Sequence, residues 1–184
     1  MKVGLVSDSH GELENLKRAA RLIMEKGHAH VIVHLGDNYD DAAVLHSTGA
    51  RIIKVPGTYC RQYADPSINK RMLVDFEGWR TLITHTPVSN PNDLPSDIRP
   101  EELMRNGEMR VMLYGHTHIP KAIDHVGFIF INPGHIKAGD NDDKPSFALL
   151  DFRPDSLEVK IIDLKTGRLV ENKTFNKCAG LHRE

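Results

Sequence analysis

Several hydrophobic stretches of this chain run directly into turns that carry aspartate or histidine. Three of these turns read Asp8-Ser9-His10-Gly11, Gly36-Asp37-Asn38 and Gly115-His116-Thr117-His118, and a fourth stretch ends at His85. Carboxylate oxygens and imidazole nitrogens are donors that first-row divalent metals accept in proteins. The residue types and their repeated placement therefore predict one shared site for metal chemistry.

Each of these motifs also has a simpler explanation when it is considered alone. Asp8 would cap the following helix while His10 faces solvent, and Asp37 would serve only as a turn residue. His116 and His118 would lie at the rim of a polar loop, although burying two imidazoles without partners is costly. Four titratable strand ends in one chain are less expected by chance than any one of them, which favours the shared site.

The first third of the chain contains the elements that would position these turns. Hydrophobic patterning predicts strands over residues 2–7, 31–35 and 51–55, and helices over residues 12–26 and 39–47. This β-α-β-α-β order is typical of a parallel sheet with helices packed on it. In such sheets the carboxyl ends of the strands meet at one edge, where the first two motifs are expected.

The rest of the chain has a more antiparallel character. A hairpin is predicted over residues 72–84, a proline-containing loop over residues 86–100 and a short helix over residues 100–106. Further strands are predicted over residues 110–114, 121–125, 128–131, 147–152, 157–163 and 168–175. The most economical arrangement is two packed sheets with helices outside them, in a single domain spanning residues 1–184.

Composition limits which binding partners and which cellular compartment we expect for this protein. The net charge is −1 without a long run of like charge, so a nucleic-acid partner is not favoured. No apolar run approaches the roughly 20 residues that span a membrane. Only two cysteines occur, Cys60 and Cys178, and the first residues show no secretion-signal pattern, so we expect a cytoplasmic protein.

Taken together, the motifs resemble those of the calcineurin-like metallophosphoesterases. Their order and spacing are most similar to the small bacterial and archaeal phosphodiesterases, a branch that also resembles the non-catalytic retromer scaffold subunit. The resemblance runs from Lys2 to about Phe152 and includes the turn Asn132-Pro133-Gly134. It implies a four-layer α/β/β/α sandwich, in which two packed mixed sheets lie between outer helices.

The resemblance also implies a two-metal centre and a reaction. Asp8, His10, Asp37 and His118 would hold the first ion, and Asp37 would bridge to a second ion held also by His85 and His116. The two divalent ions per chain would be manganese, nickel, iron or zinc. A metal-bridging hydroxide would attack a small phosphoester substrate, with diesters favoured over monoesters. Relatives are often dimers or larger, so a homo-oligomer is a further possibility.

One motif departs from the family pattern. The family places asparagine after the third-motif glycine as a ligand of the second ion, whereas this chain reads Gly57-Thr58-Tyr59. The Thr58 hydroxyl is shorter than an amide, so it would reach the ion only through water or not at all. Tyr59 stands where larger relatives have a histidine that protonates the leaving group. Thr58, Tyr59 and His135 are nevertheless candidate substrate-binding residues.

The departure at Thr58 leaves two hypotheses open. The first is an active metal-dependent phosphodiesterase. The second is a catalytically weak or inactive scaffold that binds metal and a protein partner on the same fold.

Overall fold

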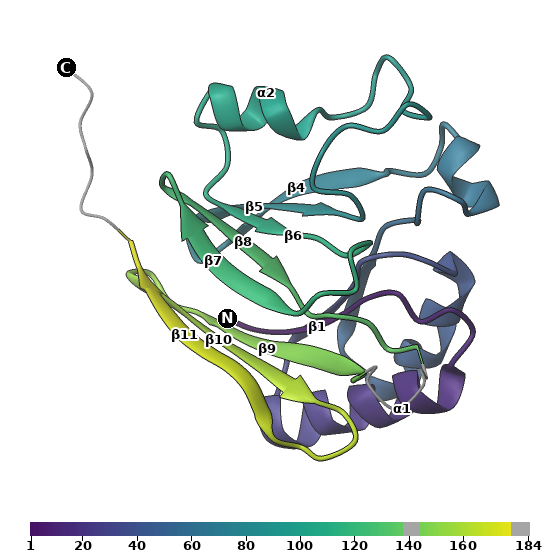
Figure 1. The fold of residues 1–184 in the computed structure, drawn as a ribbon, viewed down its shortest axis with the longest axis vertical. Helices are drawn as coiled ribbons and strands as arrows, with labels where there is room; N and C mark the ends of the chain where they lie inside the picture. The colour runs from purple at the N-terminus through teal and green to yellow at the C-terminus, as the bar shows by residue number, and fades with distance from the viewer. Residues whose placement is uncertain (138–143, 178–184) are drawn as a thin grey trace.

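The computed structural model describes residues 1–137 and 144–177, and it shows two β-sheets packed face to face (Figure 1). Cys178 lies outside these residues. The helices lie on the outer sides of the two sheets, so the described chain forms the predicted four-layer α/β/β/α sandwich.

The first sheet contains the predicted parallel unit. Its strand order is β11-β10-β9-β1-β2-β3, in which β1, β2 and β3 are parallel and the other three neighbours pair antiparallel. β2 is buried along its whole length because both faces of the sheet are covered there. The bounds are β1 Lys2–Val6, β2 Val31–His34, β3 Arg51–Lys54, β9 Ser146–Phe152, β10 Ser156–Asp163 and β11 Leu169–Asn176.

The second sheet is also mixed. Its order is β4-β5-β6-β8-β7, with β5, β6 and β8 parallel and the two outer pairs antiparallel. The predicted hairpin is confirmed as β4 and β5, which pair from Arg71 opposite Thr84 to Phe76 opposite Trp79. The bounds are β4 Arg71–Phe76, β5 Trp79–Thr84, β6 Val111–Leu113, β7 Lys121–His125 and β8 Phe128–Asn132.

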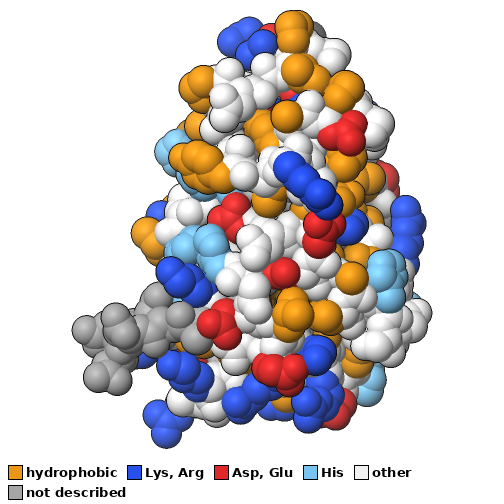
Figure 2. All heavy atoms as spheres, turned by 90° about the vertical axis from the view of Figure 1, so that its right-hand side faces the viewer, with side chains coloured by type: hydrophobic (Ala, Val, Ile, Leu, Met, Phe, Trp, Pro, Cys, Tyr) orange, Lys and Arg blue, Asp and Glu red, His pale blue; other side chains and the backbone are white. Residues whose placement is uncertain are grey.

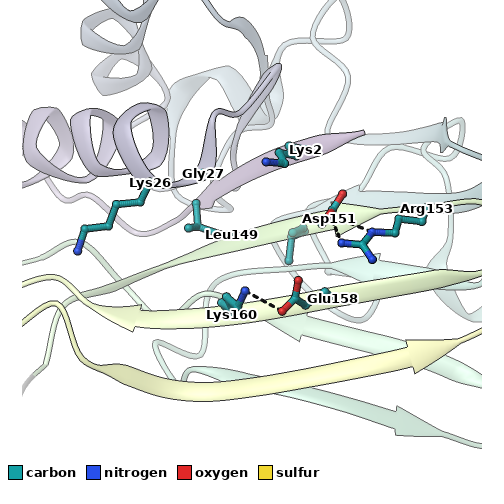
Figure 3. Close-up of a pocket in the computed structure, with 9 residues that line it drawn as sticks. Lys2, Lys26, Gly27, Leu149, Asp151, Arg153, Glu158 and Lys160 are labelled. Carbon is teal, nitrogen blue, oxygen red and sulfur yellow. Dashed lines mark hydrogen bonds and ion pairs between the residues drawn. The ribbon is translucent and has the colours of Figure 1, made fainter.

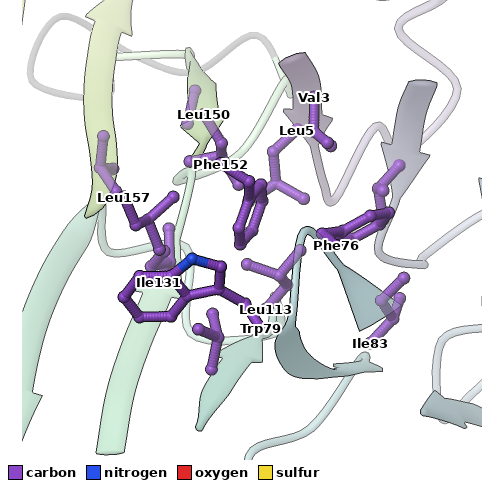
Figure 4. Close-up of a cluster of buried hydrophobic side chains, with 14 of the residues drawn as sticks. Val3, Leu5, Phe76, Trp79, Ile83, Leu113, Ile131, Leu150, Phe152 and Leu157 are labelled. Carbon is purple, nitrogen blue, oxygen red and sulfur yellow. The ribbon is translucent and has the colours of Figure 1, made fainter. Parts of the chain in front are cut away.

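The main hydrophobic core fills the space between the two sheets (Figure 4). Leu5 of β1 and Phe152 of β9 meet Trp79 and Leu113 from the opposite sheet, and all four side chains are buried. Burying one apolar side chain of this size contributes about 1.5–3 kcal/mol relative to leaving it exposed. The indole of Trp79 also donates a 2.7 Å hydrogen bond to the Arg153 carbonyl, so its polar atom is satisfied. This core fixes the sheets, and the sheets fix the loops at their edges.

The helices differ in detail from the sequence-based expectation. The helix predicted over residues 12–26 is α1, Leu13–Leu22, followed by a π-helical turn, Ile23–Gly27. His28, with φ of 49°, is the left-handed residue that follows the turn. The helix predicted over residues 39–47 is a 3-10 helix, Tyr39–Thr48, whose aspartate, valine, histidine, serine and threonine residues have low α-helix propensity.

Two shorter helices complete the fold. The 3-10 helix Arg61–Ala64 was not predicted, whereas α2, Pro100–Arg105, lies where a short helix was expected. α2 packs on the outer side of the second sheet through Leu103 and Met104, which contact the buried Met112 cluster. None of the helices in the described part of the chain is both long and apolar enough to cross a membrane.

Candidate metal centre

The predicted ligands follow strand ends, and most of them adopt a left-handed backbone. Nine non-glycine residues have positive φ in the described part of the chain, and five of them are predicted ligands. These five are Asp8 (51°), His10 (47°), Asp37 (48°), His116 (66°) and His118 (61°). Such a conformation costs an L-residue roughly 1 kcal/mol or more. Strain concentrated on these turns indicates that the fold aims their side chains at a particular point.

Four of the predicted ligands come together in space. One donor atom from each of Asp8, His10, Asp37 and His118 lies within 4.8 Å of the others. Nε2 of His118 lies 3.2 Å from Nε2 of His10 and 3.3 Å from Oδ1 of Asp8. Nε2 of His10 lies 3.4 Å from Oδ2 of Asp37. Two carboxylates and two imidazoles thus converge from the ends of β1, β2 and β6.

His85 adds a buried nitrogen beside Asp37. Its Nδ1–H donates a 2.8 Å hydrogen bond to the Leu35 carbonyl, which leaves the Nε2 lone pair free to accept. Nε2 lies 3.4 Å from Oδ1 of Asp37 and is buried without a hydrogen-bond partner among the described residues. A buried imidazole lone pair facing a carboxylate is unfavourable unless a cation lies between them.

His116 lies next to His85 rather than among the four converging residues. The two rings are 5.1 Å apart at their centroids and meet edge to face, and the His116 ring is exposed. The backbone N–H of His116 lies 3.1 Å from Oδ2 of Asp8, so the turn after β6 also holds that carboxylate. The structure therefore arranges the six predicted ligands as one group of four with His85 and His116 beside it.

The ionisation of these groups reflects their crowding. Burial raises the pKa of Asp37, and the neighbouring Asp8 carboxylate raises it further despite the opposing effect of His85. Burial also acts to raise the pKa of Asp8, but contacts with His118, His85 and Ser7 outweigh it and lower that pKa. Burial lowers the pKa of His85, whereas the Asp8 carboxylate raises the pKa of His118. Two carboxylates that disfavour each other's charge attract a cation strongly.

A hydrogen-bond chain that begins at the buried His34 supports the first two turns and was not foreseen from the sequence. Gly36 N–H donates to Nδ1 of His34, so Nε2 of His34 carries the proton and donates to the Ser9 hydroxyl at 3.2 Å. Ser9 in turn donates to Oδ2 of Asp41 at 2.7 Å, and the same oxygen accepts from Gly11 N–H at 2.8 Å. Ser9 lies between Asp8 and His10, so this chain ties their turn to the helix after Asp37. The sequence contained one indication of this chain, because His34 lies inside a predicted buried strand, where an imidazole needs hydrogen-bond partners.

Small and polar residues support the other turns. An ideal Cβ on Gly115 would lie 2.0 Å from the Ser7 hydroxyl, and one on Gly57 would lie 2.0 Å from Oδ1 of Asp37, so glycine is needed at both positions. The Ser7 hydroxyl donates to the Asp8 carboxylate. Asn132 donates to the Gly115 carbonyl at 2.9 Å, which joins the end of β8 to the turn after β6.

The three candidate substrate-binding residues occupy different environments. Thr58 is 4% exposed, and its hydroxyl is buried without a hydrogen-bond partner among the described residues. Tyr59 is 88% exposed and faces solvent. His135 is buried, its Nδ1–H donates to the Lys137 carbonyl at 3.1 Å, and its ring lies 5.1 Å from that of His118. Thr58 and His135 thus border the site, whereas the Tyr59 side chain lies on the surface.

A separate hollow on the first sheet is unrelated to these residues (Figure 3). It has a volume of about 240 Å³ and lies beside Lys2, at the start of β1, whereas Asp8 follows the end of that strand. Its charges include the ion pairs Lys160–Glu158, at 2.7 Å, and Arg153–Asp151, at 2.8 Å. The candidate site is therefore at the carboxyl edge of the sheet and not in this hollow.

The residues present fit a divalent cation. The donors are carboxylate oxygens and imidazole nitrogens, which suit first-row ions. Within residues 1–137 and 144–177, the buried Nε2 of His85, which faces Asp37, and the buried hydroxyl of Thr58, next to Gly57, have no hydrogen-bond partner. Figure 2 shows the face on the right of Figure 1, over which acidic, basic and histidine side chains are interspersed. Such a mixed face lacks the single-sign field that gathers polyanions.

Comparison with known proteins agrees with the resemblance in the motifs. The family model described as calcineurin-like phosphoesterase superfamily domain matches residues 1–155. Phosphodiesterase YfcE of Escherichia coli (strain K12) is 27% identical over 176 residues, which covers 82% of this chain and 88% of that protein.

Solved structures share the fold. A predicted phosphoesterase from Streptococcus pneumoniae TIGR4 has a TM-score of 0.70 at 19% identity, covering 96% of this chain and 97% of that one. Vps29 from Chaetomium thermophilum has a TM-score of 0.69 at 18% identity, covering 100% of this chain and 98% of that one. At these identities the likeness concerns the architecture alone.

Proposed function

Because the chain belongs to the calcineurin-like phosphoesterase superfamily, we propose that it is a dinuclear metal-dependent phosphodiesterase acting on a small phosphoester. One observation carries the proposal: donor atoms of Asp8, His10, Asp37 and His118 converge within 4.8 Å. The similarity to a phosphodiesterase over 82% of the chain supports the choice of reaction.

The proposed roles follow from where the side chains lie. Asp8, His10, Asp37 and His118 would hold one divalent ion, and His85 and His116 would hold a second ion with Asp37 between the two. When bound, two ions of manganese, nickel, iron or zinc supply a hydroxide nucleophile near neutral pH and neutralise charge on the phosphoryl oxygens.

The chain's own residues would prepare the site and orient the substrate. The Leu35 carbonyl fixes the tautomer of His85, which keeps its Nε2 directed at Asp37. His135 lies against the ring of His118 and would contact the phosphate side of the substrate. Tyr59 carries a phenol where larger relatives have a histidine that protonates the leaving group, so we expect esters with poor leaving groups to react slowly.

Other parts of the proposal rest on the sequence. We propose that the chain forms a single domain and that it is cytoplasmic, in keeping with its only two cysteines. We also propose that it can form a homo-oligomer.

The decisive experiment measures metal content and turnover on one sample. Protein reconstituted with Mn²⁺ is analysed for metal per chain and assayed with bis(p-nitrophenyl) phosphate. We expect two ions per chain and hydrolysis, with both lowered in Asp37→Asn and unchanged in Asp65→Asn, an exposed aspartate. Absence of turnover in the wild type, with metal bound, would contradict the proposed activity.

The second candidate is a metal-binding scaffold on the same fold. Thr58 favours it because its short hydroxyl stands where the family has an amide, and Tyr59 favours it because a phenol stands where larger relatives have the histidine that protonates the leaving group. In that case the wild type would bind one ion, or bind ions loosely, without turnover. The experiment above separates the two functions by the same pair of measurements.

A further inference from the structure

A hollow of about 480 Å³ has Thr58, a candidate residue of the second-ion site, in its lining. One wall is formed by residues between Thr58 and Ala64, and the other is formed by Asn92 and Leu94 from the loop over residues 86–100. Its volume falls within the range of small-molecule sites, roughly 300–1,000 Å³. We call it the Thr58 cavity.

Each wall of the Thr58 cavity belongs to a chain segment that follows a residue close to Asp37. Thr58 directly follows Gly57, whose backbone is so close to Asp37 that an added Cβ would lie 2.0 Å from its Oδ1. The loop with Asn92 and Leu94 starts just after His85, whose Nε2 lies 3.4 Å from the same oxygen. A phosphate bound at the metal centre would therefore have this cavity beside it.

The two walls are joined to each other by buried polar contacts. Asp93 lies between the lining residues Asn92 and Leu94, and its carboxylate accepts from the Tyr63 hydroxyl on the opposite wall. The same carboxylate lies 2.9 Å from Arg71 Nη1 and accepts from Asn90 N–H at 2.8 Å. The Arg71 and Asp93 side chains are 1% and 2% exposed. These contacts fix the spacing of the walls, so the cavity is formed before a ligand arrives.

The lining has the chemistry of a site for a planar ring. Tyr59 supplies an exposed aromatic face and Leu94 supplies an apolar side chain, whereas Tyr63 is 3% exposed and forms part of the wall behind them. Arg61 and Asn92 supply polar groups that would meet the ring's edge. Tyr59 is a large side chain that is 88% exposed, so it is free to pack on a ligand at the mouth.

We propose that the Thr58 cavity binds the aromatic or heterocyclic ester group of a phosphodiester whose phosphate lies at the Asp8–Asp37 site. The inference rests on the proposed function and narrows its substrate class. It predicts that a ring attached to phosphorus strengthens binding, and that filling the cavity removes this advantage.

Phenylphosphonate and methylphosphonate test the proposal without turnover, because their carbon–phosphorus bonds are not hydrolysed. Their affinities are measured by titration calorimetry on the full chain loaded with Mn²⁺. We expect phenylphosphonate to bind at least tenfold more tightly than methylphosphonate. Leu94→Trp fills the cavity and should reduce this ratio at least fivefold. Val88→Trp, in the same loop but outside the lining, should preserve the ratio, since Val88 is 54% exposed.

A second variant, Ala64→Trp, guards against misfolding of Leu94→Trp and should lower the ratio in the same way. Equal affinities in the wild type, no binding of either phosphonate, or a ratio unchanged in both filled variants would overturn the cavity assignment. A ring preference without hydrolysis of bis(p-nitrophenyl) phosphate would leave the cavity standing and count against the proposed activity alone. Hydrolysis without a ring preference would support the proposed activity and count against the cavity assignment alone.

Discussion

The Ser9 hydroxyl lies 2.7 Å from Oδ2 of Asp41, and this bond joins the turn that carries Asp8 and His10 to the helix that follows Asp37. The same aspartate oxygen accepts from Gly11 N–H at 2.8 Å. Neither Ser9 nor Asp41 is a proposed ligand, yet both hold the backbone on which two ligands stand. Supports of this kind are as much part of a metal site as the ligands.

Asp41→Ala should therefore weaken metal binding. It removes the acceptor for Ser9 and Gly11, so the His10 side chain loses its fixed direction. We expect the affinity for Mn²⁺, measured by titration calorimetry, to fall about tenfold. Asp40→Ala is the matched control, because Asp40 contacts Gln62 and Arg61 at the surface. Equal losses in the two variants would assign the effect to net charge and not to positioning.

His34 should make stability depend on pH. Burial lowers the pKa of His34 to about 4, against the opposing charges of Asp41 and Asp8. Between this value and the ordinary 6.5, the unfolded chain binds a proton that the native chain does not. The stabilisation is thus fully present above the unfolded-state pKa and is lost as the pH falls toward 4, to a total of about 3 kcal/mol.

Urea unfolding of metal-free protein between pH 4.5 and pH 7 measures this dependence. His34→Gln cannot gain a proton, so its unfolding free energy should fall less steeply with decreasing pH than that of the wild type. His125→Gln, on an exposed histidine of β7, should follow the wild-type slope. If His34→Gln and wild type lose stability in parallel, another group is responsible.

The sequence predicted the sheets and the ligand turns because both depend on local signals. Buried strands are visible as apolar runs, and a strand followed within three residues by Asp8 or His116 shows the chemistry of its turn directly. The contacts between Ser9 and Asp41, or between Tyr63 and Asp93, join segments about 30 residues apart. The hydrophobic periodicity of the sequence does not predict such a contact, because the contact forms only after the core has fixed the loops. A helix was predicted over residues 39–47, but its 3-10 type was not. The type depends on tertiary packing as well as on the low α-helix propensity of the segment.

Thr58→Asn should strengthen binding of the second ion. The Thr58 hydroxyl is buried without a hydrogen-bond partner among the described residues, and an amide would extend a carbonyl oxygen about one bond further. We expect a rise in the second-ion affinity of roughly tenfold, seen as a higher metal content at limiting Mn²⁺. Thr58→Val keeps the shape without the oxygen and should show no rise. An unchanged affinity in Thr58→Asn would mean that this position does not limit the site.

Asp93→Ala should destabilise the fold more than the loss of a surface ion pair. Asp93 accepts from Tyr63 and pairs with Arg71 at 2.9 Å, with both ionic side chains almost fully buried. Removing the carboxylate leaves the guanidinium charge buried without its counterion, which costs about 3–5 kcal/mol. The urea midpoint should fall accordingly, whereas Lys17→Ala, which breaks the exposed Lys17–Glu14 pair, should leave the midpoint unchanged.

The double variant Arg71→Met/Asp93→Ala distinguishes an uncompensated charge from lost packing. If the buried guanidinium is the cause, replacing it with an apolar side chain should restore part of the stability, so the double variant should unfold at higher urea than Asp93→Ala alone. If the double variant is the less stable of the two, the hydrogen bonds of Arg71 to Ile98, Thr86 and Val88 hold the loop by themselves. In either case the unfolding midpoint reports how firmly the wall of the Thr58 cavity is held.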